Sequence, residues 1–321
     1  MRKFYLDNLK GFLIILVILG HVVQGVFVDY QHNFLFRAIY SFHMPLFFFI
    51  SGYLTWKKVP DSRIPVKRAK QLLLPFIFWA YISPLIYQFR FDIEYTINVI
   101  LYPDNGLWFL YNLFVYSFMI WLSQRVSCKR VTQEMVLTGL FFVVCVLMVF
   151  FKTKFNCSQI CWYFPFFALG FYFRKYESKI IRYKLFLFVL GGGIWIIGVP
   201  FWMMREPPLF YQWINLGGAF SYCYRYLICF SGTCFFFFVG QKFFDSPIKF
   251  ISMLGKKTLG IYAIQFSILY YIFKLMHSLA CVEHEILIIL LATVFVIAIC
   301  ALLVSVIEKV KYVRLFLIGK E

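Results

Sequence analysis

Acidic residues are scarce in this chain. Asp and Glu number 14 against 32 Lys and Arg, and charged residues make up only 14% of the sequence. The acids fall in loops or near the ends of apolar runs, so we expect no carboxylate deep inside an apolar segment. This pattern argues against a proton pump with carboxylate relays and against a glycosidase, which needs two facing carboxyl groups.

The chain also lacks a hydrophilic stretch long enough for a separate soluble domain. Hydrophobic residues make up 62% of its 321 residues, including 43 Phe, whereas ordinary soluble domains are about 45–50% apolar. A bilayer is therefore the expected solvent for most of the chain. We predict an all-α membrane protein, a bundle of about ten transmembrane helices, with one integral membrane domain over residues 1–321 and without an internal repeat.

Cysteine is present in an odd number, nine, mostly inside apolar runs. Such thiols usually pack as small hydrophobic groups. Cys157 and Cys161 flank a short loop and could form a bridge or hold a metal, but no second ligand pair accompanies them. We therefore predict buried structural thiols and no metal site.

Ten apolar runs approach the roughly 20 residues that a membrane-spanning helix needs. The first lacks the basic start and small-residue cleavage site of a signal peptide, so we expect a retained helix. The mixed segment 90–106 is expected to be an interfacial segment or a loop. The ten runs are Phe12–Val28, Phe34–Trp56, Leu72–Phe89, Leu107–Leu122, Met135–Phe151, Ile160–Phe173, Leu185–Met204, Ala219–Val239, Thr258–Met276 and Ile286–Ile307.

The basic residues predict the orientation. With the N-terminus in the cytoplasm, 24 Lys and Arg residues fall in inner segments and 5 in outer segments. Short cytoplasmic loops carry the excess of positive charge, so both termini are predicted to be cytoplasmic in the plasma (inner) membrane. The net charge of +18 thus has a topogenic explanation, and because it forms no single patch we expect no nucleic-acid partner.

A polar stripe is predicted on the first helix. Lys10 precedes His21 by eleven residues, which places both on one face about 16 Å apart along the axis, and Asp7 and Gln24 fall near the same face. Ionisable residues inside a membrane usually mark functional sites. Anchoring of Asp7 and Lys10 at the interface, and structural packing of His21, remain alternatives.

The second helix carries another histidine, His43, at a depth similar to that of His21. The loop between the two helices has five residues, so the helices should be antiparallel neighbours. Pro45 removes a backbone hydrogen bond beside His43 and frees a carbonyl that must be satisfied locally. Arg37 lies nearer the outer surface, either to bind substrate or to reach lipid headgroups.

Without a carboxylate in the membrane, a histidine base with cationic helpers suits group transfer, because imidazole can take a proton from an attacking hydroxyl. Lys67, Arg68 and Lys70 in an inner loop could bind a phosphorylated cofactor or serve only as topogenic charge. Trp108 is either a membrane-interface aromatic or a substrate contact. Gln265 could line a polar cavity or pair with another helix.

The segments "LDNLKGFLIILVILGH" and "SFHMPLFFFISGYL" resemble the N-terminal hallmark of the acyltransferase-3 family of integral membrane acyltransferases, closest to its fucose 4-O-acetylase-related branch. The family pattern of a basic residue, ten intervening residues and a histidine is met by Lys10 and His21, and its FFF-SG signature by Phe47 to Gly52. "LWFLYNL", "FALGFYF" and "LGKKTLGIYAIQ" are similar to later signposts of the family.

The resemblance implies transfer of an acyl group, usually acetyl, from cytoplasmic acetyl-CoA to a hydroxyl of an extracytoplasmic or lipid-linked glycan. His21 would act as general base or carry the acyl group briefly. Lys10 would hold CoA phosphate or fix the donor, and His43 would orient His21 or the acceptor. Asp7 completes the candidate catalytic set on the stripe.

The remaining candidates follow from the same resemblance. CoA would dock at Lys67, Arg68 and Lys70, where family members often carry an Arg-x-x-Arg pair. Gln265 stands where the family often has His. The candidate substrate-binding residues are Arg37, Trp108, Gln24 and Gln265.

Two other functions are compatible with part of this pattern. A flippase or exporter of lipid-linked glycan would also suit ten helices and a polar lumen, but the missing inverted repeat and missing midplane carboxylates count against it. A purely structural scaffold would leave the deep histidine pair without a purpose. Acyl-CoA, a glycan or lipid-linked sugar, and membrane lipid are the expected partners.

Overall fold

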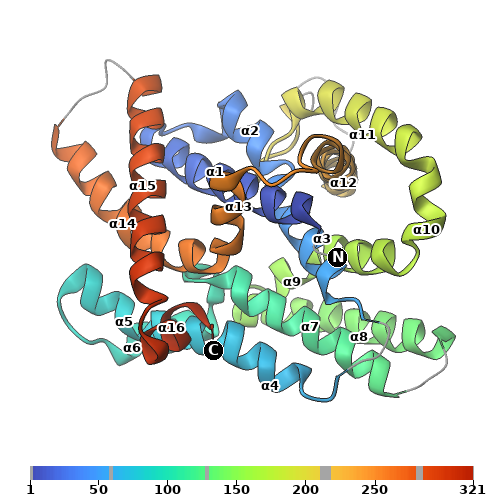
Figure 1. The fold of residues 1–321 in the computed structure, drawn as a ribbon, viewed down its shortest axis with the longest axis horizontal. Coiled ribbons are helices and arrows are strands. Elements are labelled where there is room, and N and C mark those ends of the chain that lie inside the picture. Colours follow the sequence, from blue (N-terminus) through green and yellow to red (C-terminus); the bar gives the residue numbers. More distant parts are fainter. Residues whose placement is uncertain (1–2, 58–60, 127–129, 210–217, 280–284, 321) are drawn as a thin grey trace. The chain divides into compact units, whose positions relative to one another are not determined.

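The computed structural model describes residues 3–57, 61–126, 130–209, 218–279 and 285–320. These residues fold into helices and contain no strand, so the predicted all-α membrane class is confirmed (Figure 1). Helices are found at all ten apolar runs. The predicted segment 90–106 contains a short helix, α6 (Ile93–Leu101), whose first turn is capped by the Asp92 carboxylate accepting from the Tyr95 amide at 2.9 Å.

The chain divides into two compact units, one of residues 1–50 and 176–302, the other of residues 51–175 and 303–321. We call the first the α1 unit and the second the α7 unit. Helices α3 (His43–Thr55) and α15 (Glu285–Ile307) each begin in the α1 unit and end in the α7 unit. The prediction of one domain over the whole chain stays a prediction.

The α1 unit is built on α1, which packs along α13, α14, α12 and α2. Helix α12 is seen nearly end-on in Figure 1 and packs against α11. Besides α3 and α15, its elements are α1 (Phe4–Val26), η1 (Tyr30–His32), α2 (Phe34–Tyr40), α10 (Glu177–Ile180), η5 (Ile181–Tyr183), α11 (Lys184–Gly198), η6 (Val199–Phe201), α12 (Gly218–Phe243), α13 (Lys249–Lys256) and α14 (Thr258–Leu279).

The α7 unit packs α7 against α8 and α9, and packs α5 against α6 and α16. Its close contacts use glycine where main chains meet: a side chain at Gly52 would overlap the carbonyl of Phe167. Besides α6, its elements are α4 (Ile64–Arg68), the π-helical turn η2 (Ala69–Leu73), α5 (Leu74–Gln88), η3 (Pro103–Asn105), α7 (Trp108–Val126), α8 (Arg130–Phe151), η4 (Lys154–Asn156), α9 (Cys157–Lys175) and α16 (Lys311–Ile318).

Eight helical segments of the described chain are long and apolar enough to cross a membrane. The other two expected spans are present as α7 and α9 but are less apolar. Helix α7 buries Asn112, Ser117 and Ser123 inside its unit, and α9 carries Gln159 in its first turn. Buried polar side chains lower the mean hydropathy of a helix without exposing polar groups to lipid.

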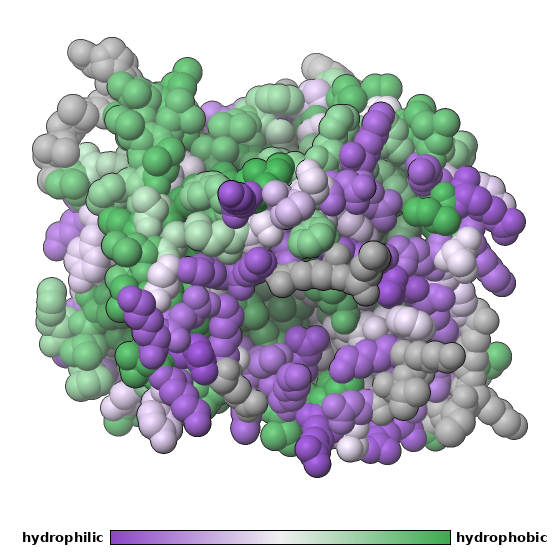
Figure 2. Space-filling view, in the orientation of Figure 1, coloured by the Kyte–Doolittle hydropathy of each residue, from purple (hydrophilic) through white to green (hydrophobic). Residues whose placement is uncertain are grey.

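Outward-facing apolar side chains fit a lipid environment. Helix α15 exposes Ile286, Leu290 and Val294, and Figure 2 shows hydrophobic surface over this helix. Helix α8 exposes Phe142 and Phe150. Exposed apolar surface of this extent is rare on soluble monomers, so the chain is a multi-pass membrane protein.

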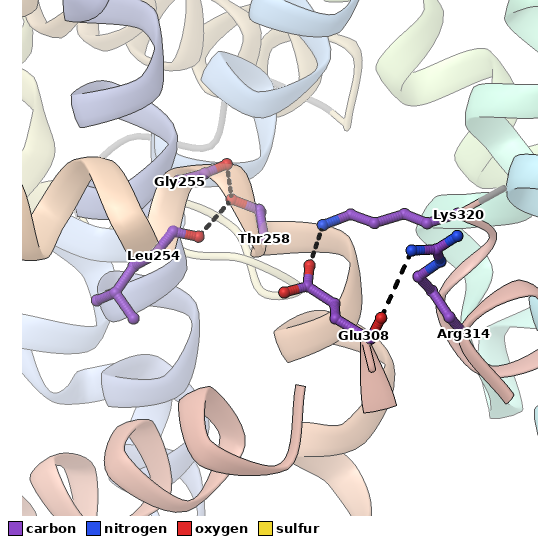
Figure 3. Close-up of polar contacts among 6 residues, drawn as sticks. All are labelled: Leu254, Gly255, Thr258, Glu308, Arg314 and Lys320. Carbon is purple, nitrogen blue, oxygen red and sulfur yellow. Dashed lines mark hydrogen bonds and ion pairs between the residues drawn. The ribbon is translucent and has the colours of Figure 1, made fainter. Parts of the chain in front are cut away.

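Polar contacts fix the turns between helices in both units (Figure 3). In the α1 unit the Thr258 hydroxyl, at the start of α14, donates to the carbonyl of Gly255 at 2.8 Å and satisfies an open carbonyl at the end of α13. In the α7 unit Lys320 forms an ion pair with Glu308, and Arg314 donates to the Glu308 carbonyl at 3.5 Å.

The described cysteines are free thiols, including Cys157 and Cys161, so no bridge joins this pair. Three of the seven are buried, Cys157, Cys229 and Cys300, whereas Cys223 is exposed. Cys128 and Cys281 lie outside the described residues.

Candidate active site

The predicted polar stripe lies on one continuous helix, α1. Lys10 Nζ forms an ion pair with the Asp7 carboxylate at 3.0 Å, across one turn. The side chains are 24% and 10% exposed, so this pair is shielded more than an ordinary surface pair. The Lys10 ammonium is therefore held in place by a neighbour from its own helix.

Two glycines bring the stripe against α13. A Cβ at Gly11 of α1 would overlap the carbonyl of Ile251, and a Cβ at Gly255 of α13 would overlap the carbonyl of Asp7. Glycine is the residue that allows two helix backbones to approach this closely. The contact fixes the position of the Asp7 backbone, and with it the Asp7–Lys10 pair.

His21 is oriented by two neighbours on α1 and α2. Its Nδ1 lies 2.9 Å from Gln24 Oε1, and the Tyr40 hydroxyl donates to the same oxygen at 2.8 Å. An amide oxygen only accepts hydrogen bonds, so Nδ1 is the donor to Gln24. The Phe266 ring packs edge-on against the imidazole at 4.9 Å between centroids. In the neutral form of the ring this contact makes Nε2 the basic nitrogen.

We expect Gln24→Leu to lower the transfer rate about tenfold to a hundredfold, the range typical of a lost second-layer contact to a functional histidine. Gln24→Glu should restore most of the rate, because the carboxylate again accepts from Nδ1. Steady-state transfer assays on both variants measure this. Equal losses in the two variants would contradict a role in orienting the ring.

The second helix breaks between Tyr40 and His43, where α2 ends and α3 begins. Pro45 has no amide hydrogen to continue the ladder. The carbonyl of Ile39 in the last turn of α2 accepts a hydrogen bond from His43 Nδ1 at 2.8 Å. The Ile39 carbonyl also accepts from the Phe42 amide at 3.3 Å, whereas the carbonyl that Pro45 leaves without an amide partner is that of Ser41, four residues earlier. The bond from His43 therefore ties α3 to the last turn of α2 and is not the local satisfaction expected beside Pro45.

Tyr40 joins the two histidines. Its ring lies edge-on to His43 at 4.6 Å and to His21 at 6.4 Å between centroids. His43 is 2% exposed, whereas His21 is only partly buried. The predicted proximity of the two imidazoles is confirmed, and Tyr40 between them was not predicted.

Arg37 and Gln265 are both buried in the α1 unit. Arg37 is 8% exposed and donates from Nη1 to the Pro200 carbonyl, so it does not reach outward to headgroups as one alternative expected. Gln265 on α14 is fully buried, and neither of its amide atoms has a partner in the described part of the chain. The expected pairing of Gln265 with another helix is therefore not seen.

The predicted CoA-binding cations and Trp108 lie in the α7 unit. Lys67 and Arg68 end α4, and Lys70 sits in the π-helical turn that precedes Pro75. Lys67 and Lys70 are exposed, and Arg68 Nη1 donates to Gln71 at 3.4 Å. Single π-turns inside helices are frequent at functional sites.

Trp108 begins α7 and stacks on Tyr163 of α9, with ring centroids 5.2 Å apart and planes 27° apart. It is partly exposed. A partly exposed stacked aromatic pair suits contact with a sugar ring or with the membrane interface, so both sequence-based interpretations of Trp108 fit its surroundings.

Comparison with known proteins decides the family. A family model described as an acyltransferase domain matches residues 3–305, and so spans both units. The chain belongs to the acyltransferase-3 family. The resemblance inferred from the N-terminal motifs is therefore confirmed.

Two curated proteins are similar in sequence to this acyltransferase-3 chain. Nodulation protein NolL of Sinorhizobium fredii is 31% identical over 206 residues, 58% of this chain and 54% of the relative. Nodulation protein NolL of Mesorhizobium japonicum is 28% identical over 206 residues, 59% of this chain and 53% of the relative. The chain spans about half the length of these relatives. No solved structure matches it.

Within this acyltransferase-3 chain, sequence reasoning missed Tyr40 and Phe266 at the histidine site. Tyr40 follows Arg37 by three residues, and Phe266 directly follows Gln265. Helical spacing from Arg37 could have identified Tyr40, because residues three apart share a face. No local signal marks Phe266, since its approach to His21 depends on the packing of α14 against α1.

Proposed function

We propose that the chain is a membrane O-acyltransferase that moves an acyl group, in particular acetyl, from cytoplasmic acyl-CoA to a hydroxyl of a cell-surface or lipid-linked glycan. The observation that carries the proposal is the Nδ1 hydrogen bond of His21 to Gln24, which leaves Nε2 basic, in a chain of the acyltransferase-3 family. We further propose a plasma-membrane location with both termini in the cytoplasm, on the distribution of basic residues.

The proposed reaction uses His21 Nε2 as general base. Nε2 takes the proton of the attacking hydroxyl, and the oxygen forms a bond to the thioester carbonyl carbon. The carbon–sulfur bond then breaks, and the CoA thiolate leaves with the proton that the imidazolium returns. In the alternative mechanism, with His21 as acyl carrier, Nε2 first takes the acyl group and the CoA thiolate leaves. The acceptor hydroxyl then removes the acyl group from Nε2 in a second step.

The other predicted residues have proposed supporting roles. Lys10, held by Asp7, attracts the phosphates of the donor. His43 presents Nε2 to the acceptor or to His21, with its Nδ1 fixed on Ile39. Arg37, Trp108, Gln24 and Gln265 contact the acceptor, Gln24 in addition to orienting His21.

A transfer assay tests the proposal. The full chain in lipid nanodiscs is mixed with labelled acetyl-CoA and a membrane extract that contains lipid-linked sugars. We expect label in the glycan fraction only when the protein is present. Passage of unmodified glycan across the bilayer without acyl-CoA would instead favour the exporter, which the acyltransferase family match does not support.

We expect Lys67→Gln, Arg68→Gln and Lys70→Gln together to raise the KM for acyl-CoA about tenfold or more with little change in kcat. Charge-assisted bonds to phosphate stabilise ground state and transition state alike. Lys179→Gln, at an exposed lysine of α10, is the matched control. An unchanged KM in the triple variant would place CoA binding elsewhere.

A further inference from the structure

Four polar side chains, three of them buried and one, Arg225, partly buried, lie where α2 begins, α11 and η6 end, and α12 begins, all within the α1 unit. They are Arg37, Trp202, Ser221 and Arg225, which we call the arginine cluster. Each has a buried donor without a hydrogen-bond partner in the described residues: Nε of both arginines, the indole nitrogen and the serine hydroxyl.

Arg37 is a buried cation without a counter-ion. The side chain donates to the Pro200 carbonyl through Nη1 only, and no described carboxylate lies within ion-pair distance. A guanidinium that leaves water without a charged partner pays a large desolvation cost. A buried arginine in this condition is suited to an anionic partner from outside the chain.

Arg225 also has no charged partner among the described residues. Its Nη2 donates to the backbone carbonyl of Glu206, and its guanidinium lies 5.7 Å from the centre of the Tyr222 ring. The Glu206 carboxylate is exposed and accepts instead from Gln31 at 3.1 Å. The Glu206 carboxylate therefore does not neutralise Arg225.

The cluster is contiguous around η6. Pro200, which accepts from Arg37, lies two residues before Trp202. The Trp202 indole and the Arg225 guanidinium both lie near the Cys229 thiol, which does not have hydrogen-bond geometry to the indole nitrogen. A thiol is only a weak acceptor, so the indole N–H stays available. Ser221 precedes Arg225 by one helical turn and shares its face.

We propose that the arginine cluster binds an oxyanion, a phosphate or carboxylate group carried by the acyl acceptor. Two guanidinium groups, an indole N–H and a hydroxyl supply donors without a competing carboxylate, and arginine matches the fork of phosphate and carboxylate oxygens. The acceptor class is therefore an acidic sugar or a sugar linked to phosphate. Only the naming of the acceptor as the source rests on the proposed function.

Inorganic pyrophosphate is the probe for the site. Calorimetric titration of the full chain in phosphatidylcholine nanodiscs, without acyl-CoA, should give saturable binding. Arg37→Gln and Arg225→Gln should each weaken it at least about tenfold, as loss of hydrogen bonds to a charged group implies. Arg205→Gln, at an exposed arginine of the same connection, should bind like wild type.

Unchanged affinity in both cluster variants, or no saturable binding in the wild type, would overturn the oxyanion site. Arg225 is only partly buried, so its variant remains informative if Arg37→Gln does not fold. Because no acyl donor is present, failure of the transferase proposal leaves this result intact.

Two further experiments distinguish the molecules that could carry the oxyanion, a lipid headgroup and the acyl acceptor. Phosphatidylglycerol added to the nanodiscs should not displace pyrophosphate; displacement would assign the site to a lipid headgroup and overturn the assignment to the acceptor. In the transfer assay, Arg225→Gln should raise the KM of a phosphate-linked sugar and leave that of a neutral sugar unchanged. Equal effects on both sugars would contradict the proposal.

Discussion

Replacing His21 by asparagine is expected to lower the rate of acyl transfer by about 10² to 10⁴, the usual contribution of a positioned general base. Asparagine fills part of the imidazole space and can still bond to Gln24, but it has no basic nitrogen to take the proton. The transfer assay with labelled acetyl-CoA measures the loss. Acyl transfer at the wild-type rate would remove His21 from the chemistry.

His32→Asn is the matched control for that experiment. His32 lies in η1 and is exposed, and its Nδ1 contacts Asp29 at 2.7 Å. The same substitution there should leave transfer unchanged. Mixtures without acceptor, denatured rapidly at neutral pH because acylimidazoles hydrolyse in acid, separate the two roles of His21. Label retained on the wild-type protein and lost in His21→Asn indicates an acyl carrier, whereas no label indicates a base.

Gly255→Ala is expected to destabilise the protein by about 1–3 kcal/mol or more, the range for overpacked contacts. The added methyl group would overlap the Asp7 carbonyl, and main-chain atoms of two helices cannot rotate away as a side chain can. Thermal unfolding in detergent, with the yield of monodisperse protein, measures the change.

Gly139→Ala provides the control for the glycine experiment. Gly139 lies within α8, and no atom lies within 4 Å of the methyl group it would gain. Alanine in a helix interior is favoured over glycine by about 0.5–1 kcal/mol, so this variant should be as stable as wild type or more stable. Equal destabilisation of both variants would refute the close contact between α1 and α13.

Hydropathy and spacing predicted the helices well but not their ends or interruptions. The ten apolar runs all contain helices because each must satisfy its backbone hydrogen bonds internally. The break before His43 was only partly predicted. Pro45 marked the region, but the hydrogen bond from the His43 ring to the Ile39 carbonyl depends on how the side chain is placed, which the sequence does not show. The buried polar side chains of α7 show the limit of counting apolar residues, since Asn112 is buried although it is polar.

The candidate site was predictable where partners share one helix. Asp7 with Lys10, and His21 with Gln24, are three residues apart, and both contacts form. Arg37 shows why the rest could not be predicted. The carbonyl it contacts lies 163 positions away, and no sequence pattern connects two residues at that separation.

The bond from His43 to Ile39 has a consequence for mutagenesis. The Ile39 carbonyl already accepts from the Phe42 amide at 3.3 Å, so the imidazole is a second donor that ties α3 to the last turn of α2, whatever chemistry its other nitrogen performs. Alanine at position 43 would remove this tie and the Nε2 nitrogen together, and an alanine scan could not separate the two losses. Asparagine, whose side-chain amide can stand in for the Nδ1 donor, is the substitution that keeps the tie and isolates the reactivity of Nε2.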